Sequence, residues 1–142
     1  MARPSKYTQK IADQICERLA DGESLKRICS GDEMPNKATV FRWLDAHKTF
    51  RDMYVRAREA QADSLADEII DIADDGVNDT FIDDNGSVRI NYDIVARSKL
   101  RVDARKWVAA KLKPRVYSDR PEADGPADIA KVLADLIVKL PN

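Results

Sequence analysis

Apolar residues recur every three or four positions in three short segments of the first 46 residues, and this spacing predicts three helices. The first helix follows Thr8, whose hydroxyl can cap it, and ends near Gly22. Glu23 or Ser24 opens a short second helix. The third helix covers about residues 37–46, after a connection that contains Gly and Pro. We therefore expect a three-helix unit at the N-terminus.

The third helix has two faces of different character. Val40, Trp43 and Leu44 form an apolar face that can anchor the helix to the first two helices. A second set of side chains is polar and is expected to point outward, where phosphates and base edges can be reached. The residues of this outward set are Lys37, Thr39 and Arg42.

A long apolar stripe follows and predicts a fourth helix over about residues 49–74. The pattern changes in residues 76–93, where two short β-prone pieces flank Asn85-Gly86, a dipeptide typical of a tight hairpin turn. A fifth helix follows over about residues 94–112. A connection of this length allows the two long helices to pack antiparallel. The predicted fold class is all-α, with a long central antiparallel helical hairpin and a small β-hairpin insertion.

The last part of the chain combines two kinds of sequence. Residues 118–127, SDRPEADGPA, are rich in Pro and charged residues and are expected to form a linker. Residues 129–140 show apolar positions at helical spacing, which predicts an amphipathic C-terminal segment. This segment either packs against the assembly of its own chain or docks as a helix in a groove of a partner.

Charge is unevenly distributed along the 142 residues, although the formal net charge is only −1. Residues 1–60 carry 12 basic and 9 acidic side chains, and residues 61–85 carry 9 acidic and no basic ones. Residues 86–120 carry 10 basic and 3 acidic side chains. The acids of the fourth helix thus complement the bases of the fifth. This arrangement favours a helical hairpin or contacts between neighbouring subunits.

Signals for enzymatic chemistry are poor. The sequence has no glycine-rich phosphate loop, and its single histidine, His47, lies at the end of a predicted helix. No cysteine–histidine cluster has zinc spacing, and Asp83 and Asp84 lack the glutamate that a calcium loop requires. Cys16 and Cys29 fall on apolar helix faces and are expected to be reduced core residues. We therefore expect no catalytic residues, no cofactor, no metal site and no membrane-spanning segment.

Signals for nucleic-acid binding are better. A basic arm, MARPSKY, precedes three helices that match a helix-turn-helix. Two observations count against this interpretation. The connection SGDEMPN is longer than the usual turn of about three to four residues. In addition, residues 1–60 have a net charge of only +3. Each copy is expected to bind DNA weakly, so useful affinity needs several copies. The candidate DNA-binding residues are Arg3, Lys6, Lys10, Lys26, Arg27, Lys37, Thr39 and Arg42.

Other interpretations stay open from the residues alone. The bases can be ordinary surface residues of a helical protein, including a structural ring component that does not touch DNA. The chain can also be a helix-turn-helix transcription regulator that acts as a dimer, or a small nuclease that uses carboxylates and a metal. Native mass separates a dimer from a ring, and metal-dependent cleavage of DNA by the purified chain would support the nuclease.

Six short blocks stand out along the chain: RPSKY (3–7), GESL (22–25), MPNKATVFRWL (34–44), FRD (50–52), LRVDARKW (100–107) and KPRVYSD (113–119). In these blocks and in their order, the chain resembles the small terminase subunits of tailed double-stranded-DNA bacteriophages. The resemblance spans most of residues 3–119. It is weakest at residues 76–93 and after residue 119.

This resemblance implies a ring-shaped homo-oligomer of about eight or nine copies in the host cytoplasm. It implies that the ring binds the packaging site on double-stranded viral DNA. It also implies that the ring recruits and regulates the large terminase subunit, which carries the ATPase and the nuclease. The domains implied are a helix-turn-helix DNA-binding domain (1–48), a central oligomerisation domain (49–117) and a C-terminal segment for large-subunit contact (118–142).

The resemblance also implies roles for individual residues. The DNA-facing positions of the family correspond to Arg27, Lys37, Thr39 and Arg42. The residues expected to contact neighbouring subunits are Tyr54, Leu65, Ile69, Ile72, Leu100, Arg101 and Trp107. The residues expected to contact the large subunit are Ile129, Leu133, Leu136 and Ile137.

Overall fold

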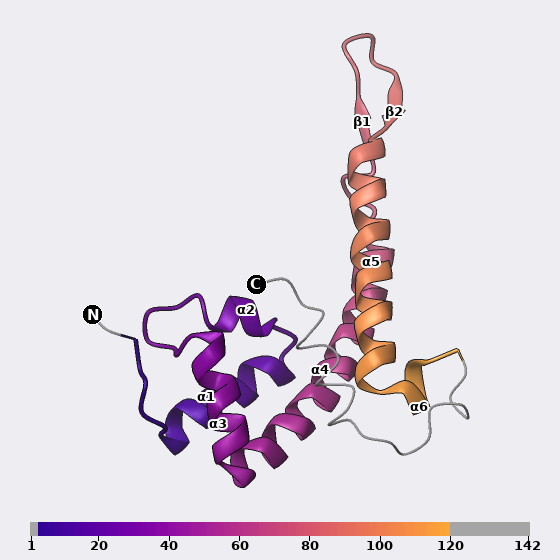
Figure 1. Ribbon diagram of the computed structural model, residues 1–142. Helices are drawn as coiled ribbons and strands as arrows, with labels where there is room; N and C mark the ends of the chain where they lie inside the picture. The colour runs from indigo at the N-terminus through magenta and orange to yellow at the C-terminus, as the bar shows by residue number, and fades with distance from the viewer. Residues whose placement is uncertain (1–2, 120–142) are drawn as a thin grey trace.

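The computed structural model describes residues 3–119, and in this part the chain is mostly helical with one small two-stranded antiparallel sheet (Figure 1). The order of helices and hairpin agrees with the prediction. The residues expected to contact the large subunit, Ile129, Leu133, Leu136 and Ile137, lie outside the described residues. The elements, in chain order, are α1 (Gln9–Ala20), α2 (Leu25–Ile28), α3 (Lys37–Ala46), α4 (Lys48–Asp74), β1 (Thr80–Ile82), β2 (Val88–Ile90), α5 (Tyr92–Leu112) and α6 (Pro114–Tyr117).

Each of the first three helices begins at a side-chain cap. Thr8, Ser24 and Asn36 have extended backbones, and each side-chain oxygen accepts a hydrogen bond from the backbone N–H three residues further on. Gly22 follows α1 with a φ of +104°, a conformation that residues with a Cβ rarely adopt. The structure confirms the predicted cap at Thr8 and the predicted end of the first helix. Of the two predicted starts of the second helix, Ser24 is the one that is found.

The main core lies where α1, α2 and α3 pack on the first half of α4 (Figure 1). Phe50 and Tyr54 of α4 are 0% and 1% exposed and lie in the same buried cluster as Ile15 and Val40. The end of α5 reaches this cluster through Leu112. The core therefore crosses the domain boundary expected between α3 and α4, and that boundary itself stays a prediction.

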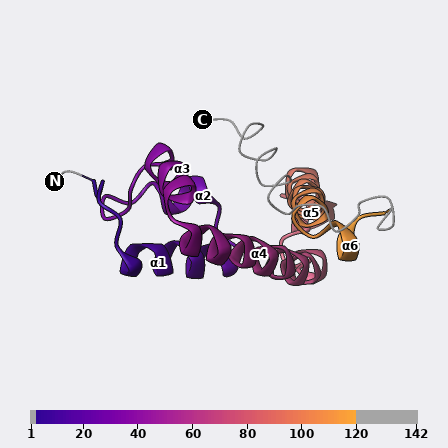
Figure 2. The same cartoon turned by 60° about the horizontal axis from the view of Figure 1, so that its bottom comes forward.

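The second half of α4 pairs with α5, and the pair projects away from the three-helix unit (Figure 2). The Nε of Arg105 lies 2.7 Å from an Oε of Glu68, and the Nζ of Lys113 lies 3.1 Å from an Oδ of Asp63. The predicted antiparallel helical hairpin is confirmed. The acids of α4 and the bases of α5 are thus matched in part within one chain.

The strands β1 and β2 form a hairpin beyond the end of the helical pair (Figure 1). Their register places Ile82 opposite Val88, and Gly86 in the turn has a φ of +79°. Every residue of both strands is exposed, so the strands add nothing to the core. The hairpin predicted around Asn85-Gly86 is confirmed.

A short helix, α6, follows α5 and is missing from the sequence prediction. Pro114 occupies its first turn, where a missing N–H has no helical partner to lose. Tyr117 of α6 donates a 2.7 Å hydrogen bond to an Oδ of Asp63 on α4. This contact connects residues far apart in sequence, so no local pattern could reveal it.

Three further observations concern the predicted absences and the cysteines. No helix within residues 3–119 has both the length and the apolarity to cross a membrane. In the same part of the chain, no group of three or more His, Cys, Asp or Glu side chains is placed to hold a metal ion. Cys16 and Cys29 are both buried and both free, as predicted.

Candidate nucleic-acid interface

The exposed side of α3 centres on three residues that share one helical face. Ala38, Arg42 and Asp45 are all exposed. Val40 and Trp43, on the opposite side, are 0% and 5% exposed and belong to the core. Positions i, i+4 and i+7 lie on one face of a helix. The outward face of α3 therefore presents a guanidinium between a methyl group and a carboxylate.

Thr39 does not belong to this outward face, and the prediction that it points outward is wrong. Its exposed fraction is only 3%. Residues four apart lie above one another on a helix, so Thr39 shares the side of the buried Trp43. Its backbone N–H donates a 2.9 Å hydrogen bond to the side chain of Asn36, and its Oγ1 accepts one of 2.9 Å from Arg42. Thr39 therefore positions the side chain of Arg42 and has almost no exposed surface of its own.

The arm before α1 is bound to the rest of the chain at two places. The Arg3 guanidinium donates a hydrogen bond to the backbone carbonyl of Cys29, the C-cap of α2. At the end of α3, Tyr7 stacks on His47 with ring centroids 3.8 Å apart and meets Trp43 edge to face at 5.5 Å. In this structure the arm thus lies against the three-helix unit, and its contact with DNA stays a prediction.

Two of the candidate bases act on the buried thiol of Cys29. Burial raises the pKa of this thiol, and the positive charges of Lys37 and Arg3 oppose the shift. Lys37 is also the first residue of α3, at the positive end of the dipole of that helix. The remaining candidates are spread over the arm, α1 and α2. These exposed residues are Lys6, Lys10, Lys26 and Arg27.

Sequence reasoning missed Ala38 and Asp45, which share the exposed face with Arg42. The signal that could have found them is their spacing opposite Val40, because residues on the side away from the core must face solvent. Arg51, in the first turn of α4, is a further exposed base beside this unit that was not among the candidates.

Some of the predicted subunit contacts are buried inside the chain itself. Tyr54 is 1% exposed, and Leu65 and Ile72 are each 8% exposed. These three side chains have almost no surface left to offer a partner, so their assignment as direct contacts is corrected. Ile69 is half-buried, whereas Leu100, Arg101 and Trp107 of α5 are exposed. Only the α5 members of the set present a large free surface.

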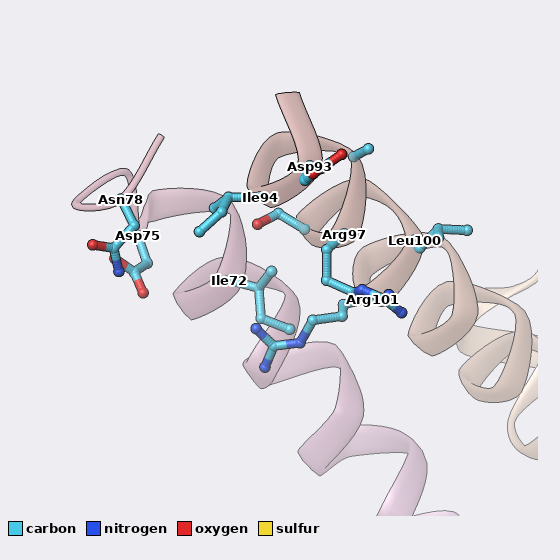
Figure 3. Close-up of a pocket in the computed structure, with 10 residues that line it drawn as sticks. Ile72, Asp75, Asn78, Asp93, Ile94, Arg97, Leu100 and Arg101 are labelled. Atoms are coloured by element: carbon cyan, nitrogen blue, oxygen red, sulfur yellow. The ribbon is translucent and has the colours of Figure 1, made fainter. Parts of the chain in front are cut away.

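A cavity of about 670 Å³ lies between the end of α4 and the start of α5 (Figure 3). Ile72 and Ile94 form part of its apolar wall. Arg97 and Arg101 also line the cavity, and Figure 3 shows the side chain of Arg101 extending from α5 toward Ile72 of α4. The cavity therefore combines apolar and basic surface at the base of the β-hairpin.

The described fold is a three-helix unit on a long helical pair, and known proteins share it. Residues 7–124 match the family model described as bacteriophage Sf6, terminase small subunit-like. Two crystal structures of variants of the terminase small subunit gp1 of the bacterial virus Sf6 are 46% and 45% identical to this chain. Each match covers 82% of this chain and 80% of the other, with a TM-score of 0.67.

A further relative is the uncharacterised protein YffO of Escherichia coli strain K12. It is 36% identical over 80 residues, which span 54% of this chain and 58% of that protein. Together, the fold and these matches define a small subunit of the bacteriophage packaging terminase. Within this class, the chain belongs to the Sf6 terminase small subunit-like family.

Proposed function

We propose that this protein is the DNA-recognition adaptor of a phage packaging terminase. It binds the packaging site on double-stranded viral DNA as a ring of copies in the host cytoplasm, and it recruits and regulates the large subunit. The chemistry of cleavage and ATP hydrolysis then belongs to the large subunit. Family membership supports this proposal over a dimeric transcription regulator. The exposed face of α3 is the observation that carries it.

In this proposal, α2, the connection after it and α3 act as a helix-turn-helix, with α3 in the major groove. The exposed guanidinium of Arg42, oriented by Thr39, is suited to the acceptor edge of a guanine. The methyl group of Ala38, on the same face, is suited to contact with a thymine methyl. Lys26 and Arg27 on α2 would bind phosphates and set the position of α3 on the duplex.

Each three-helix unit offers few positive charges, so a single copy would bind weakly and with a shallow dependence on salt. Several copies in one assembly would convert these weak contacts into useful affinity. The C-terminal segment, residues 118–142, would contact the large subunit. Apart from its first two residues, that segment lies outside the described residues.

The test is binding of duplex DNA from the packaging region by full-length protein, followed by fluorescence anisotropy at fixed salt. Arg42→Ala should weaken binding by about 1–3 kcal/mol per engaged unit, because a base contact is lost. Its native mass should not change. Arg89→Ala is the matched control: it removes the same charge from an exposed side chain on the distant hairpin.

The control variant should bind as the unmodified chain does. Equal DNA affinity in Arg42→Ala and the unmodified protein would contradict the role of the α3 face. An equal loss in both variants would show that only total charge matters.

A further inference from the structure

One side of the β1–β2 hairpin consists mainly of exposed aliphatic side chains. The register pairs Ile82 with Val88, and it also pairs Ile90 with Thr80. Residues paired across two strands, and residues two apart along one strand, point to the same side of a sheet. Ile82, Val88 and Ile90 are 73%, 70% and 51% exposed. These three side chains define the aliphatic face of the hairpin.

The fold of the chain does not explain this aliphatic face. None of its side chains belongs to the buried cluster of residues 3–119. Strand propensity explains branched side chains but not apolar ones, because threonine suits a strand as well as valine or isoleucine does. Thr80 occupies the fourth position on the same side. Three adjacent exposed aliphatic side chains therefore indicate a surface that a partner covers.

The charges around the hairpin restrict the class of that partner. Residues 75–93 carry five acidic side chains and one basic side chain, so their net charge is −4. The basic one, Arg89, is paired with Asp83, with 2.8 Å between its Nε and an Oδ. Asp84, in the turn, is exposed and has no ion pair within the described residues. This surface repels DNA and anionic lipid, and it fits an apolar protein surface with a basic rim.

The position of the hairpin leaves the candidate DNA interface open. The hairpin lies beyond the end of the α4–α5 pair, away from the three-helix unit that contains α3 (Figure 1). A protein bound to the aliphatic face would therefore not cover the exposed side of α3 in the same copy. One chain could hold DNA at α3 and a protein at the hairpin at the same time.

We propose that the aliphatic face of the hairpin is a docking surface for the large terminase subunit. The inference rests on the proposed function, which requires a protein partner that is held while DNA is bound. The face would enter an apolar groove of the large subunit, and Asp84 would meet a lysine or arginine at the edge of that groove. This contact is additional to the one proposed for residues 118–142.

Docking would also complete the hairpin itself. A two-stranded sheet is marginally stable in water, and it becomes stable when a third strand or another layer covers its apolar side. The groove of the large subunit would supply that layer. The hairpin should therefore exchange its amide hydrogens more slowly in the complex than in the free chain.

The test measures binding of the purified large subunit of the same phage to the full-length chain by biolayer interferometry at fixed salt. Ile82→Thr keeps a branched side chain suited to a strand but makes the centre of the face polar. The Kd should rise at least about fivefold, because a buried aliphatic contact is lost. Val77→Thr is the matched control, since Val77 is 83% exposed but lies before β1. Its Kd should equal that of the unmodified chain.

Asp84→Lys tests the charge of the partner surface. Binding should weaken and should depend less on salt, because the attraction between an exposed carboxylate and a basic rim is lost. Unchanged or stronger binding in this variant would contradict the basic rim. Exchange of the Asp83 amide, which is bonded to the carbonyl of Ser87, shows whether the hairpin is intact in each variant.

Other occupants of the aliphatic face give different results with the same variant. If a second copy covers it, Ile82→Thr lowers the native mass measured by light scattering. If DNA covers it, Ile82→Thr weakens DNA binding in fluorescence anisotropy. We expect neither change, and either one would overturn the proposal.

Failure of this inference differs from failure of the proposed function. If the unmodified chain binds the large subunit and Ile82→Thr binds it equally well, the hairpin contact is wrong while recruitment stands. If the unmodified chain does not bind the large subunit, both recruitment and the hairpin contact are wrong. DNA recognition is tested separately by Arg42→Ala.

Discussion

A nitrogen of the Arg42 guanidinium donates a 2.9 Å hydrogen bond to the Oγ1 of Thr39, one turn earlier on α3. Thr39 is buried and its backbone is held by the Asn36 cap, so the acceptor is fixed. The exposed Arg42 is therefore oriented by a rigid neighbour before any partner arrives. Such preorganisation lowers the entropy cost of immobilising a long side chain on binding.

Thr39→Val keeps the shape of the side chain but removes the acceptor for Arg42. We expect DNA affinity to fall by about 0.5–1.5 kcal/mol, the typical cost of ordering one flexible side chain. Thr39→Ser keeps the hydroxyl and is the matched control, with affinity close to that of the unmodified chain. Fluorescence anisotropy with duplex DNA measures both. Equal affinity of the valine and serine variants would show that Thr39 does not position Arg42.

Arg58 is a buried cation held by neutral groups. Its exposed fraction is 5%, and it donates to the Tyr54 hydroxyl from Nε at 3.2 Å and from Nη2 at 2.9 Å. A third hydrogen bond of 2.8 Å runs to the Oε1 of Gln61, whose amide donates to the backbone carbonyl of Glu23 at 2.9 Å. This network joins α4 to the turn between α1 and α2.

Tyr54→Phe should remove the hydroxyl oxygen that accepts two hydrogen bonds from the buried guanidinium of Arg58. Because hydrogen bonds to charged groups are strong and an unsatisfied buried donor is costly, we expect the free energy of unfolding to fall by about 2–4 kcal/mol. Urea unfolding at one fixed protein concentration measures it. Tyr92→Phe alters a tyrosine that is 74% exposed and should change stability by less than about 0.5 kcal/mol. Similar values for both variants would refute a stabilising role for the network.

The contact between α6 and α4 should respond to pH at both ends of the scale. The hydrogen bond from Tyr117, and after it the one from Lys113, lower the pKa of Asp63. The ionised carboxylate therefore stabilises the fold fully above its ordinary pKa of 3.8, and this stabilisation is lost as pH falls through the lower pKa of the folded state. The hydrogen bond to Asp63 raises the pKa of Tyr117 to about 12. The protonated phenol therefore stabilises the fold fully below its ordinary pKa of 10.0, and this stabilisation is lost as pH rises through about 12.

Absorbance at the phenolate wavelength tests this assignment. Asp63→Asn removes the negative charge beside Tyr117, and we expect that phenol to titrate at a lower pH than in the unmodified chain. Tyr117→Phe shows which part of the absorbance titration belongs to Tyr117, because the step near pH 12 should disappear. An unchanged curve in Asp63→Asn would rule out the carboxylate as the cause. Both groups are partly exposed, so the effect on global stability should be small.

Two glycines with positive φ should differ in their effect on stability. A Cβ at Gly22 would lie 3.1 Å from an Oε of Glu68, which is held by Arg105, and the φ of +104° adds backbone strain. Gly22→Ala should therefore lower the free energy of unfolding by about 1–3 kcal/mol. Gly86→Ala introduces comparable strain in a turn with nothing within 4 Å of the new Cβ.

For Gly86→Ala we expect faster amide exchange in the hairpin without a change in global unfolding, because the strands are exposed. Urea unfolding and hydrogen exchange of the Asp83 amide, which is bonded to Ser87, separate the two results. A global loss in Gly86→Ala equal to that in Gly22→Ala would mean that the hairpin is part of the main folding unit.

Local chemistry let the sequence predict most of the elements. The third helix is found over Lys37–Ala46, as expected, because an Asn cap and an apolar stripe both act within one turn of the chain. The hairpin forms where Asn85-Gly86 supplies a turn that only a few dipeptides favour. The fifth helix starts slightly earlier than predicted, since Asn91 caps it.

The sequence by itself determined the helices, their caps and the family, because these depend on short-range hydrogen bonds and on the residues in order. Only the tertiary structure decided which side chains are free to act. Thr39 is buried because Trp43 shares its side of α3, and Tyr54 is buried because α1 and α3 pack on α4 around it. Burial is set by elements far apart in sequence, so the periodicity of one helix cannot distinguish a contact for a partner from a contact within the chain.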